Sequence, residues 1–317
     1  MGTLRLLMAL VVMIFHLGVP VFGVSYGVSA VVVFFIISGF AITALVQSHY
    51  LRTSRLPAFF LDRLLRLYPQ YLLYVFAVAT VGTLLGLSDT YFHTECSPGG
   101  YALNLSLVPL DYWESFGTAT FRRCMLISQS WTIGLEFQIY IVLGILLVTS
   151  SRRIAFSLSG TVFLFALFGA FAYKWFIYVY VPPTLFIFLC GSMLATGKRG
   201  ELAIVAFTWV ASVAGLLFAH LYPERMAFLG FEMLLGIAIG IPAVAIASRL
   251  KVSAFDGILG SMSYGVYLNH YLLILAVRKL APAVPGGAIE AALTVPLACF
   301  FAWLTYSVRG VPSNAMA

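Results

Sequence analysis

Long apolar runs alternate with short polar or Pro/Gly-rich breaks along almost the whole chain. Ten such runs stand out, at about residues 6–24, 28–47, 68–87, 129–149, 154–173, 175–196, 202–221, 226–247, 257–277 and 286–306. Each run is close to the ~20 residues that a helix needs to cross a bilayer. The pattern therefore predicts an all-α, polytopic membrane protein with about ten transmembrane helices. Because Pro182 and Pro183 fall in the sixth run, we expect that helix to be kinked or to start late.

The composition agrees with a membrane protein and excludes several soluble classes. Of the 317 residues, 62% are hydrophobic and 9% are charged, whereas a soluble domain carries about 25% charge. So few charged side chains cannot cover a soluble surface, which excludes a soluble enzyme, a DNA-binding protein and a disordered chain. The net charge of +7 is better explained by the positive-inside rule than by nucleic acid. The lipid bilayer is therefore the expected partner.

The distribution of Lys and Arg predicts the orientation of the chain. Ten spans place both termini on one side, and a cytoplasmic N-terminus puts 12 of the 18 basic residues on the inside. We expect both termini in the cytoplasm and a multi-pass protein of the plasma (inner) membrane. Residues 1–317 are expected to form a single transmembrane domain with a basic cytoplasmic loop at 48–67 and an outward-facing loop at 88–128. Cys96 and Cys124 share the outer loop, where a disulfide could form, although sequence spacing does not decide whether it does.

Ionisable side chains inside the hydrocarbon are costly and usually mark a functional site. Arg5, at the cytoplasmic end of the first span, and His16, inside that span, share one helix face and lie ~16 Å apart along the axis. His16, Glu136, Glu232 and His270 come from four different runs, and each lies ~9–12 Å in from the outer end of its run. We therefore expect one polar cavity that opens outward. The alternative is four separate polar side chains, each satisfied by a neighbouring helix.

These residue types suit general base catalysis. An imidazole beside a carboxylate can take a hydroxyl proton, because the carboxylate fixes the tautomer and stabilises the imidazolium. On the cytoplasmic side, Arg63 and Arg66 share one face of any helix through RLLRLYP. Paired guanidinium groups suit phosphate, and the alternative is simple positive-inside charge.

The chain resembles the acyltransferase-3 family of polytopic membrane acyltransferases. The similar segments occur in the family's order: Arg5-x10-His16, FFIISGF at 34–40, RLLRLYP at 63–69, SWTIGLEFQIY at 130–140 and SYGVYLNH at 263–270. One departure is visible near the C-terminus, where the chain reads YSVRGVP at 306–312. Gly310 stands where family members often have glutamate, so no role is carried onto that segment.

The resemblance implies acyl transfer from cytoplasmic acyl-CoA, often acetyl-CoA, to a hydroxyl of an extracytoplasmic glycan or glycolipid. It implies no metal cofactor. The residues that it implicates, with two further members of the polar layer, are His16 and Glu136 for catalysis, Arg5, Arg63 and Arg66 for binding acyl-CoA, and His270, Tyr267 and Glu232 as additional candidates.

Two other classes compete with the enzyme. Buried His and Glu in ten helices also suit a proton-coupled transporter, but no inverted repeat is detectable and the polar layer is off-centre. A glycan-binding accessory protein without chemistry is disfavoured because Arg5, His16 and Glu136 are all present.

Overall fold

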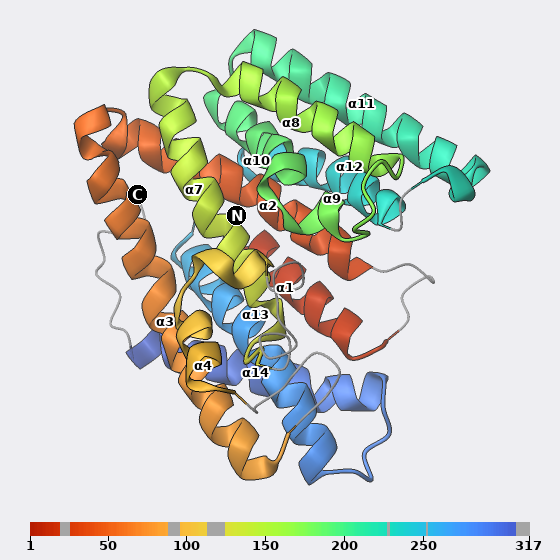
Figure 1. Ribbon diagram of the computed structural model, residues 1–317. Helices are drawn as coiled ribbons and strands as arrows, with labels where there is room; N and C mark the ends of the chain where they lie inside the picture. The colour runs from red at the N-terminus through yellow and green to blue at the C-terminus, as the bar shows by residue number, and fades with distance from the viewer. Residues whose placement is uncertain (20–25, 88–95, 113–123, 227–228, 252, 309–317) are drawn as a thin grey trace. The chain divides into compact units, whose positions relative to one another are not determined.

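The computed structural model describes residues 1–19, 26–87, 96–112, 124–226, 229–251 and 253–308 (Figure 1). These residues form helices and connecting turns, with no strand among them, so the all-α prediction is confirmed for the described chain. The helices are α1 (Gly2–His16), α2 (Tyr26–Leu45), α3 (Leu56–Leu85), α4 (Pro98–Leu105), α7 (Trp131–Thr149), α8 (Arg152–Leu167), α9 (Phe176–Val179), α10 (Val181–Thr196), α11 (Arg199–Leu221), α12 (Gly230–Ala247), α13 (Ala254–Leu280) and α14 (Ala288–Val308).

Several of these helices are long and apolar enough to cross a membrane. Within the described residues there are six such segments: Tyr26–Tyr50, Thr53–Leu85, Ser128–Thr149, Arg199–Leu221, Gly230–Ala247 and Ala288–Ser307. Helices α1 and α10 are apolar but shorter. The count of ten spans and the cytoplasmic placement of both termini stay predictions.

Two of the predicted apolar runs extend beyond the observed helices, because a glycine ends each of these helices. Helix α1 ends at His16, and Gly18 follows with a left-handed φ of 69°. The Gly18 N–H then donates to Phe15 O at 3.0 Å and the Val19 N–H to Ile14 O at 3.4 Å, which is the Schellman pattern. Gly169, with φ of 77°, ends α8 in the same way, so the predicted bounds 6–24 and 154–173 are too long; residues 20–25 lie outside the described structure.

The basic segment 48–67 was expected to be a cytoplasmic loop, and most of it is helical instead. A π-helical turn at Val46–Tyr50 and a 3-10 turn at Thr53–Arg55 lead directly into α3 at Leu56. Pro57 stands in the first turn of α3, where its fixed φ and missing N–H are tolerated. The third span therefore begins twelve residues earlier than the run at 68–87 indicated.

The proline pair acts as the sequence predicted. Helix α9 ends at Val179, Tyr180 adopts an extended conformation, and α10 starts at Val181 with the prolines in its first turn. The sixth run is therefore interrupted and its main helix starts late.

The chain divides into two compact units. Unit 1 comprises residues 1–27, 66–134 and 251–317, and unit 2 comprises 28–65 and 135–250. In unit 1, α13 packs against both α1 and α14, and in unit 2, α10 packs against α8 and α11, which packs against α12 (Figure 1). The single domain expected for the whole chain stays a prediction.

A buried ion pair connects the helices of unit 2. Arg152 Nη2 donates to Glu201 Oε1 at 3.0 Å, and its Nη1 donates to Ser192 Oγ at 3.0 Å. Thr43 Oγ1 donates to the same serine hydroxyl at 2.7 Å. The sequence indicated only a topology-setting charge at Arg152, whereas the structure places it 7% exposed in a satisfied polar network of four helices.

Candidate active site

The site in unit 1 is built on two parallel helices that run in register. At one end, the Asp256 carboxylate of α13 accepts hydrogen bonds from the backbone N–H groups of Gly2 (2.9 Å) and Thr3 (2.8 Å). At the other end, His16 of α1 meets His270 of α13. The same fourteen residues, ~21 Å of helix, separate the two contacts along both helices. The end-to-end match therefore fixes which turn of α13 faces His16.

The anchored end is tightly packed and charged. A Cβ added at Gly2 would overlap the Asp256 carbonyl oxygen, so the two backbones touch there. The Met1 amino group donates to Asp256 Oδ2 at 2.8 Å. This amino group, together with the donors of Gly2 and Thr3, holds the pKa of the Asp256 carboxyl well below its usual range.

The two histidines form a hydrogen-bonded pair. His270 Nε2 lies 3.1 Å from His16 Nδ1, and the ring centroids are 5.0 Å apart. His270 is fully buried and its Nδ1 lies 3.1 Å from Val266 O, while His16 Nδ1 also lies 3.0 Å from Val12 O. The sequence placed both imidazoles in one layer, and the structure brings them into direct contact.

Tyrosines flank the pair on the α13 side. The Tyr271 ring meets the His16 ring edge-on, with centroids 5.5 Å apart. The Tyr267 ring centroid lies 6.0 Å from that of His270, and its hydroxyl is 3.0 Å from Thr132 Oγ1. Tyr267 was a candidate from the sequence, whereas Tyr271 was missed, although it directly follows His270, the last residue of the SYGVYLNH motif.

The two candidate glutamates belong to unit 2. Glu136 Oε1 accepts hydrogen bonds from Ser38 Oγ at 2.5 Å and from the Tyr140 hydroxyl. This carboxylate therefore has partners within its own unit, and its role toward His16 stays a prediction. Glu232 lies half-buried in the first turn of α12, where its backbone oxygen accepts from Ser29 Oγ at 2.9 Å.

The candidate arginines lie on α1 and α3. Arg5 is half-exposed in the second turn of α1, ~16 Å along the helix from His16. The Arg63 guanidinium is nearly buried, with Nε donating to Asp62 Oδ2 at 3.1 Å, whereas Arg66 is exposed one turn later. Both Nε and Nη2 of Arg63 donate to Asp62, so an oxyanion would have to bind the remaining N–H groups of the guanidinium, and the role of Arg63 in acyl-CoA binding stays a prediction.

A disulfide joins Cys96, just before α4, to the segment that leads into α7. Cys96 and Cys124 are bonded, with their Cα atoms 4.8 Å apart, which settles the open question about this pair. Asn104 then holds the next residues, donating to Cys124 O at 2.6 Å and accepting from the Leu126 N–H at 3.1 Å.

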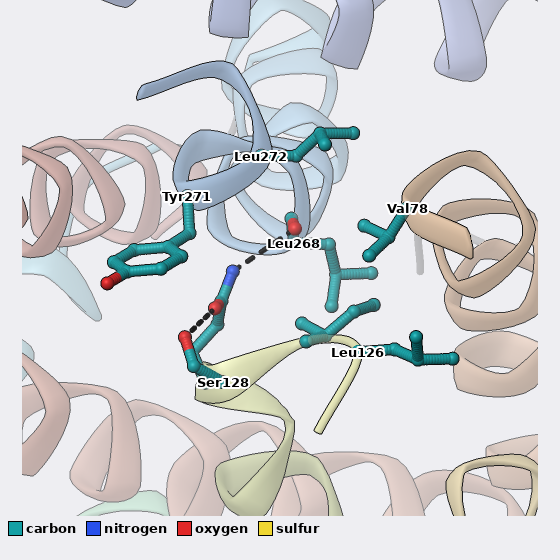
Figure 2. A pocket seen from close by; sticks show the side chains of 8 residues that line it. Val78, Leu126, Ser128, Leu268, Tyr271 and Leu272 are labelled. Atoms are coloured by element: carbon teal, nitrogen blue, oxygen red, sulfur yellow. Dashed lines mark hydrogen bonds between the residues drawn. The ribbon is translucent and has the colours of Figure 1, made fainter. Parts of the chain in front are cut away.

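This segment ends in a 3-10 turn, Ser128–Ser130, that docks on α13. Gln129 Nε2 donates to the carbonyl oxygens of Tyr267 (2.8 Å) and Leu268 (3.1 Å), and Ser128 Oγ donates to Gln129 Oε1 at 3.0 Å (Figure 2). Sequence reasoning missed Gln129, because a lone amide before an apolar run gives no periodic signal. Its position just before the tryptophan of SWTIGLEFQIY is the one indication available.

Metal binding has no structural support within the described ranges. No group of three or more His, Cys, Asp or Glu residues there could hold a metal ion. Unit 1 brings together the two imidazoles of His16 and His270, with the rings of Tyr267 and Tyr271 beside them.

Comparison with known proteins identifies the class. The family model described as an acyltransferase domain, Acyl_transf_3, matches residues 2–307. The chain belongs to this acyltransferase family, and with its several long apolar helices it is a multi-pass membrane acyltransferase. The resemblance seen in the sequence is confirmed.

Relatives with curated names agree with the family. The chain is 25% identical to the "Exopolysaccharide production protein ExoZ" of Rhizobium meliloti, over 92% of this chain and 88% of that protein. It is 31% identical to the "Putative O-acetyltransferase SACOL0978" of Staphylococcus aureus, over 46% of this chain and 24% of that protein. A protein of Aquifex aeolicus without a functional name is 28% identical over 49% of this chain and 73% of its own length. No solved structure matches.

Proposed function

We propose that the chain is an O-acyltransferase that moves an acyl group, acetyl in the first instance, from cytoplasmic acyl-CoA to a hydroxyl of an extracytoplasmic glycan or glycolipid. It would work in the plasma (inner) membrane as part of cell-envelope modification. The family membership and the O-acetyltransferase name of one relative support the reaction type. The name of ExoZ, which refers to exopolysaccharide production, supports a glycan acceptor.

The observation that carries the proposal is the contact between His16 and His270. If His270 Nδ1 holds a proton and donates it to Val266 O, its Nε2 is left as an acceptor. His16 Nδ1 then donates to His270 Nε2, and the lone pair of His16 lies on its Nε2. Among the described residues, the hydrogen bonds of the His16 ring both involve Nδ1. His270 would thus fix the tautomer of His16 as the triad carboxylate does in serine proteases.

His16 Nε2 can serve in two ways. As a base, it takes the proton of the acceptor hydroxyl while the hydroxyl oxygen attacks the thioester carbonyl. The carbon–sulfur bond breaks, and the coenzyme A thiolate takes the proton back from the imidazolium. As an acyl carrier, Nε2 itself attacks the carbonyl, the carbon–sulfur bond breaks and coenzyme A leaves as the thiolate, so that His16 becomes an N-acyl imidazolium. The acceptor hydroxyl then attacks the acyl carbon, the nitrogen–carbon bond breaks, and His16 passes the hydroxyl proton to the thiolate. Glu136 is proposed to assist His16 in either route.

The donor is proposed to enter from the cytoplasm. Arg63 and Arg66, with Arg5, would bind the phosphates, because charge-assisted hydrogen bonds from guanidinium groups suit them. The pantetheine arm would then follow α1 toward His16.

Ligand-induced stabilisation separates this enzyme from a proton-coupled transporter. A ligand present at 100 times its Kd stabilises a folded protein by about 2.7 kcal/mol. We expect coenzyme A to raise the unfolding temperature of the purified protein in lipid nanodiscs, and the double variant Arg63→Ala, Arg66→Ala to lose this shift. A wild-type protein that does not respond to coenzyme A at any concentration would contradict the acyl-CoA donor. The control is Arg153→Ala, another basic residue near a helix start, which should keep the shift.

A further inference from the structure

The turn before α7 contacts α13 directly next to the histidine pair. Gln129 is 4% exposed, and its amide donates to two successive carbonyl oxygens of α13, those of Tyr267 and Leu268. Tyr267 and Leu268 lie three and two residues before His270, so Gln129 is hydrogen-bonded to the helical turn that precedes His270. In Figure 2, where Ser128, Leu268 and Tyr271 are labelled, the dashed lines mark the hydrogen bonds of the Gln129 amide with Ser128 and with Leu268.

Neighbouring contacts give the amide one orientation. Ser128 Oγ donates to Gln129 Oε1, which leaves Nε2 as the end that faces α13. Thr132 Oγ1 donates to Gln129 O at 3.0 Å and is also within 3.0 Å of the Tyr267 hydroxyl. Backbone and side chain of the same α13 turn are therefore both held by the 128–132 segment.

The segment is itself fastened at its other end. Five residues before Gln129, Cys124 is bonded to Cys96, and the Asn104 side chain donates to both Cys124 O and Gly100 O. Leu126 and Ile127, between the disulfide and Gln129, are buried at 0% and 2% exposure. A rigid connection thus runs from the disulfide to the turn that carries His270.

We propose that Gln129 is a positioning residue for the histidine pair and that the Cys96–Cys124 disulfide holds Gln129 in place. This inference rests on the proposed function. The His16–His270 contact is 3.1 Å long, so a displacement of α13 by 1 Å would take it out of hydrogen-bonding range. Misplacement on that scale costs up to about 100-fold in rate. Acyl-CoA would still bind, because Arg63 and Arg66 are not part of the connection.

A matched pair of substitutions tests the positioning role. Gln129→Met keeps the side-chain length and removes the amide, and we expect kcat to fall about 10- to 100-fold with KM for acetyl-CoA within about twofold of wild type. Gln70→Met removes another buried amide of unit 1, one that donates to Thr305 of α14. This control should keep its kcat. A merely structural role of Gln129 predicts a lower unfolding temperature but an unchanged kcat for Gln129→Met, as for Gln70→Met, and this result would contradict the positioning role.

Reduction of the wild-type disulfide tests the second half of the proposal without any substitution. Dithiothreitol treatment of the folded protein should lower kcat in the same range, and reoxidation should restore it. The double variant Cys96→Ser, Cys124→Ser should start at the lower kcat and not respond to dithiothreitol. A wild-type kcat that is indifferent to complete reduction would remove the disulfide from the proposal.

Chemical labelling gives a result that does not depend on turnover. His270 is fully buried, so diethylpyrocarbonate should modify it slowly in wild type and several-fold faster in Gln129→Met, but not in Gln70→Met, as read by mass spectrometry. Equal labelling of the three proteins together with an unchanged kcat would overturn the positioning role. If wild type transfers no acyl group at all, the proposed function fails while the labelling still decides on Gln129.

Discussion

Replacing His270 separates the two parts that an imidazole can play beside His16. In His270→Leu a side chain of similar size fills the space but offers no nitrogen. In His270→Gln the amide oxygen can reach toward His16 Nδ1, as His270 Nε2 does at 3.1 Å, and accept its hydrogen bond. Comparing the two variants therefore shows whether His16 needs only a hydrogen-bond acceptor for its Nδ1–H or a second imidazole that can itself take up a proton.

The size of the effect follows from the contacts that remain. In His270→Leu the His16 Nδ1–H can still donate to Val12 O, which lies 3.0 Å away. What is lost is one hydrogen bond to the ring that becomes positively charged during transfer, and hydrogen bonds to charged groups contribute about 1.5–3 kcal/mol. At 1.36 kcal/mol per tenfold, this corresponds to a decrease in kcat of about 10- to 150-fold. His270→Gln should recover most of it.

The assay is transfer of radiolabelled acetyl groups from acetyl-CoA to a glycan acceptor by protein reconstituted in lipid, with unfolding temperatures measured in parallel. A kcat for His270→Leu within twofold of wild type would refute the orienting role. If His270→Gln is as impaired as His270→Leu although both fold, an acceptor alone is insufficient and His270 must itself exchange the proton.

Further perturbations test the donor site, the helix anchor and the buried charge. Arg63→Ala and Arg66→Ala should each raise KM for acetyl-CoA about tenfold or more, since each removes hydrogen bonds to a charged phosphate; steady-state kinetics at varied acetyl-CoA checks this, and an unchanged KM in both would exclude a phosphate role. The pKa of Asp256 is lowered in the folded protein, so its contacts stabilise the fold fully above the ordinary carboxyl pKa of about 4. This stabilisation is lost as the pH falls from that value through the lower pKa of the folded state. The unfolding temperature of wild type should therefore fall more steeply toward acid pH than that of Asp256→Asn, and parallel curves would argue against the anchor. Glu201→Ala leaves the buried Arg152 without its carboxylate and should lower the free energy of unfolding by about 3–5 kcal/mol, measured by denaturant titration, whereas Glu201→Asp should cost less.

The parts of the site that the sequence indicated are those with a chemical signature in an apolar background. His16 and His270 were recognisable because an imidazole inside an apolar run is costly, and counting residues at 1.5 Å each placed both near the same level. Their direct contact required the tertiary register of α1 and α13. That register depends on Asp256 capping the start of α1, and an acidic residue just before an apolar run is otherwise an ordinary helix start.

Helix boundaries were harder to predict than helices, for a local reason. Hydropathy continued past Gly18 and Gly169, and only their left-handed φ values end the helices. A glycine just after the last helical residue is a recognisable C-terminal signal of a helix, so the ends of these two helices could have been predicted from the sequence. The start of α3 at Leu56 could not be predicted in this way. The many charged residues of the 48–67 segment lower its mean hydropathy, although one face of the helix is apolar and buries Phe59.

Other features depend on contacts that no local pattern encodes. Gln129 contacts α13 because the disulfide and Asn104 hold the segment 124–130 against that helix. Arg152 looked like one more inner charge until Glu201, 49 residues later, was found beside it. In both cases the partner is distant in sequence and polar, and hydrophobic periodicity carries no information about such pairs.

The most direct test of the proposed chemistry is acetyl transfer by wild type and His16→Ala, measured with labelled acetyl-CoA in the same reconstituted lipid system. His220→Ala, which removes an exposed histidine at the end of α11, is the matched control. We expect His16→Ala to lose about 10²- to 10⁴-fold in kcat with an unchanged unfolding temperature, and His220→Ala to match wild type. Normal turnover by folded His16→Ala would contradict the assignment of His16 as base or acyl carrier.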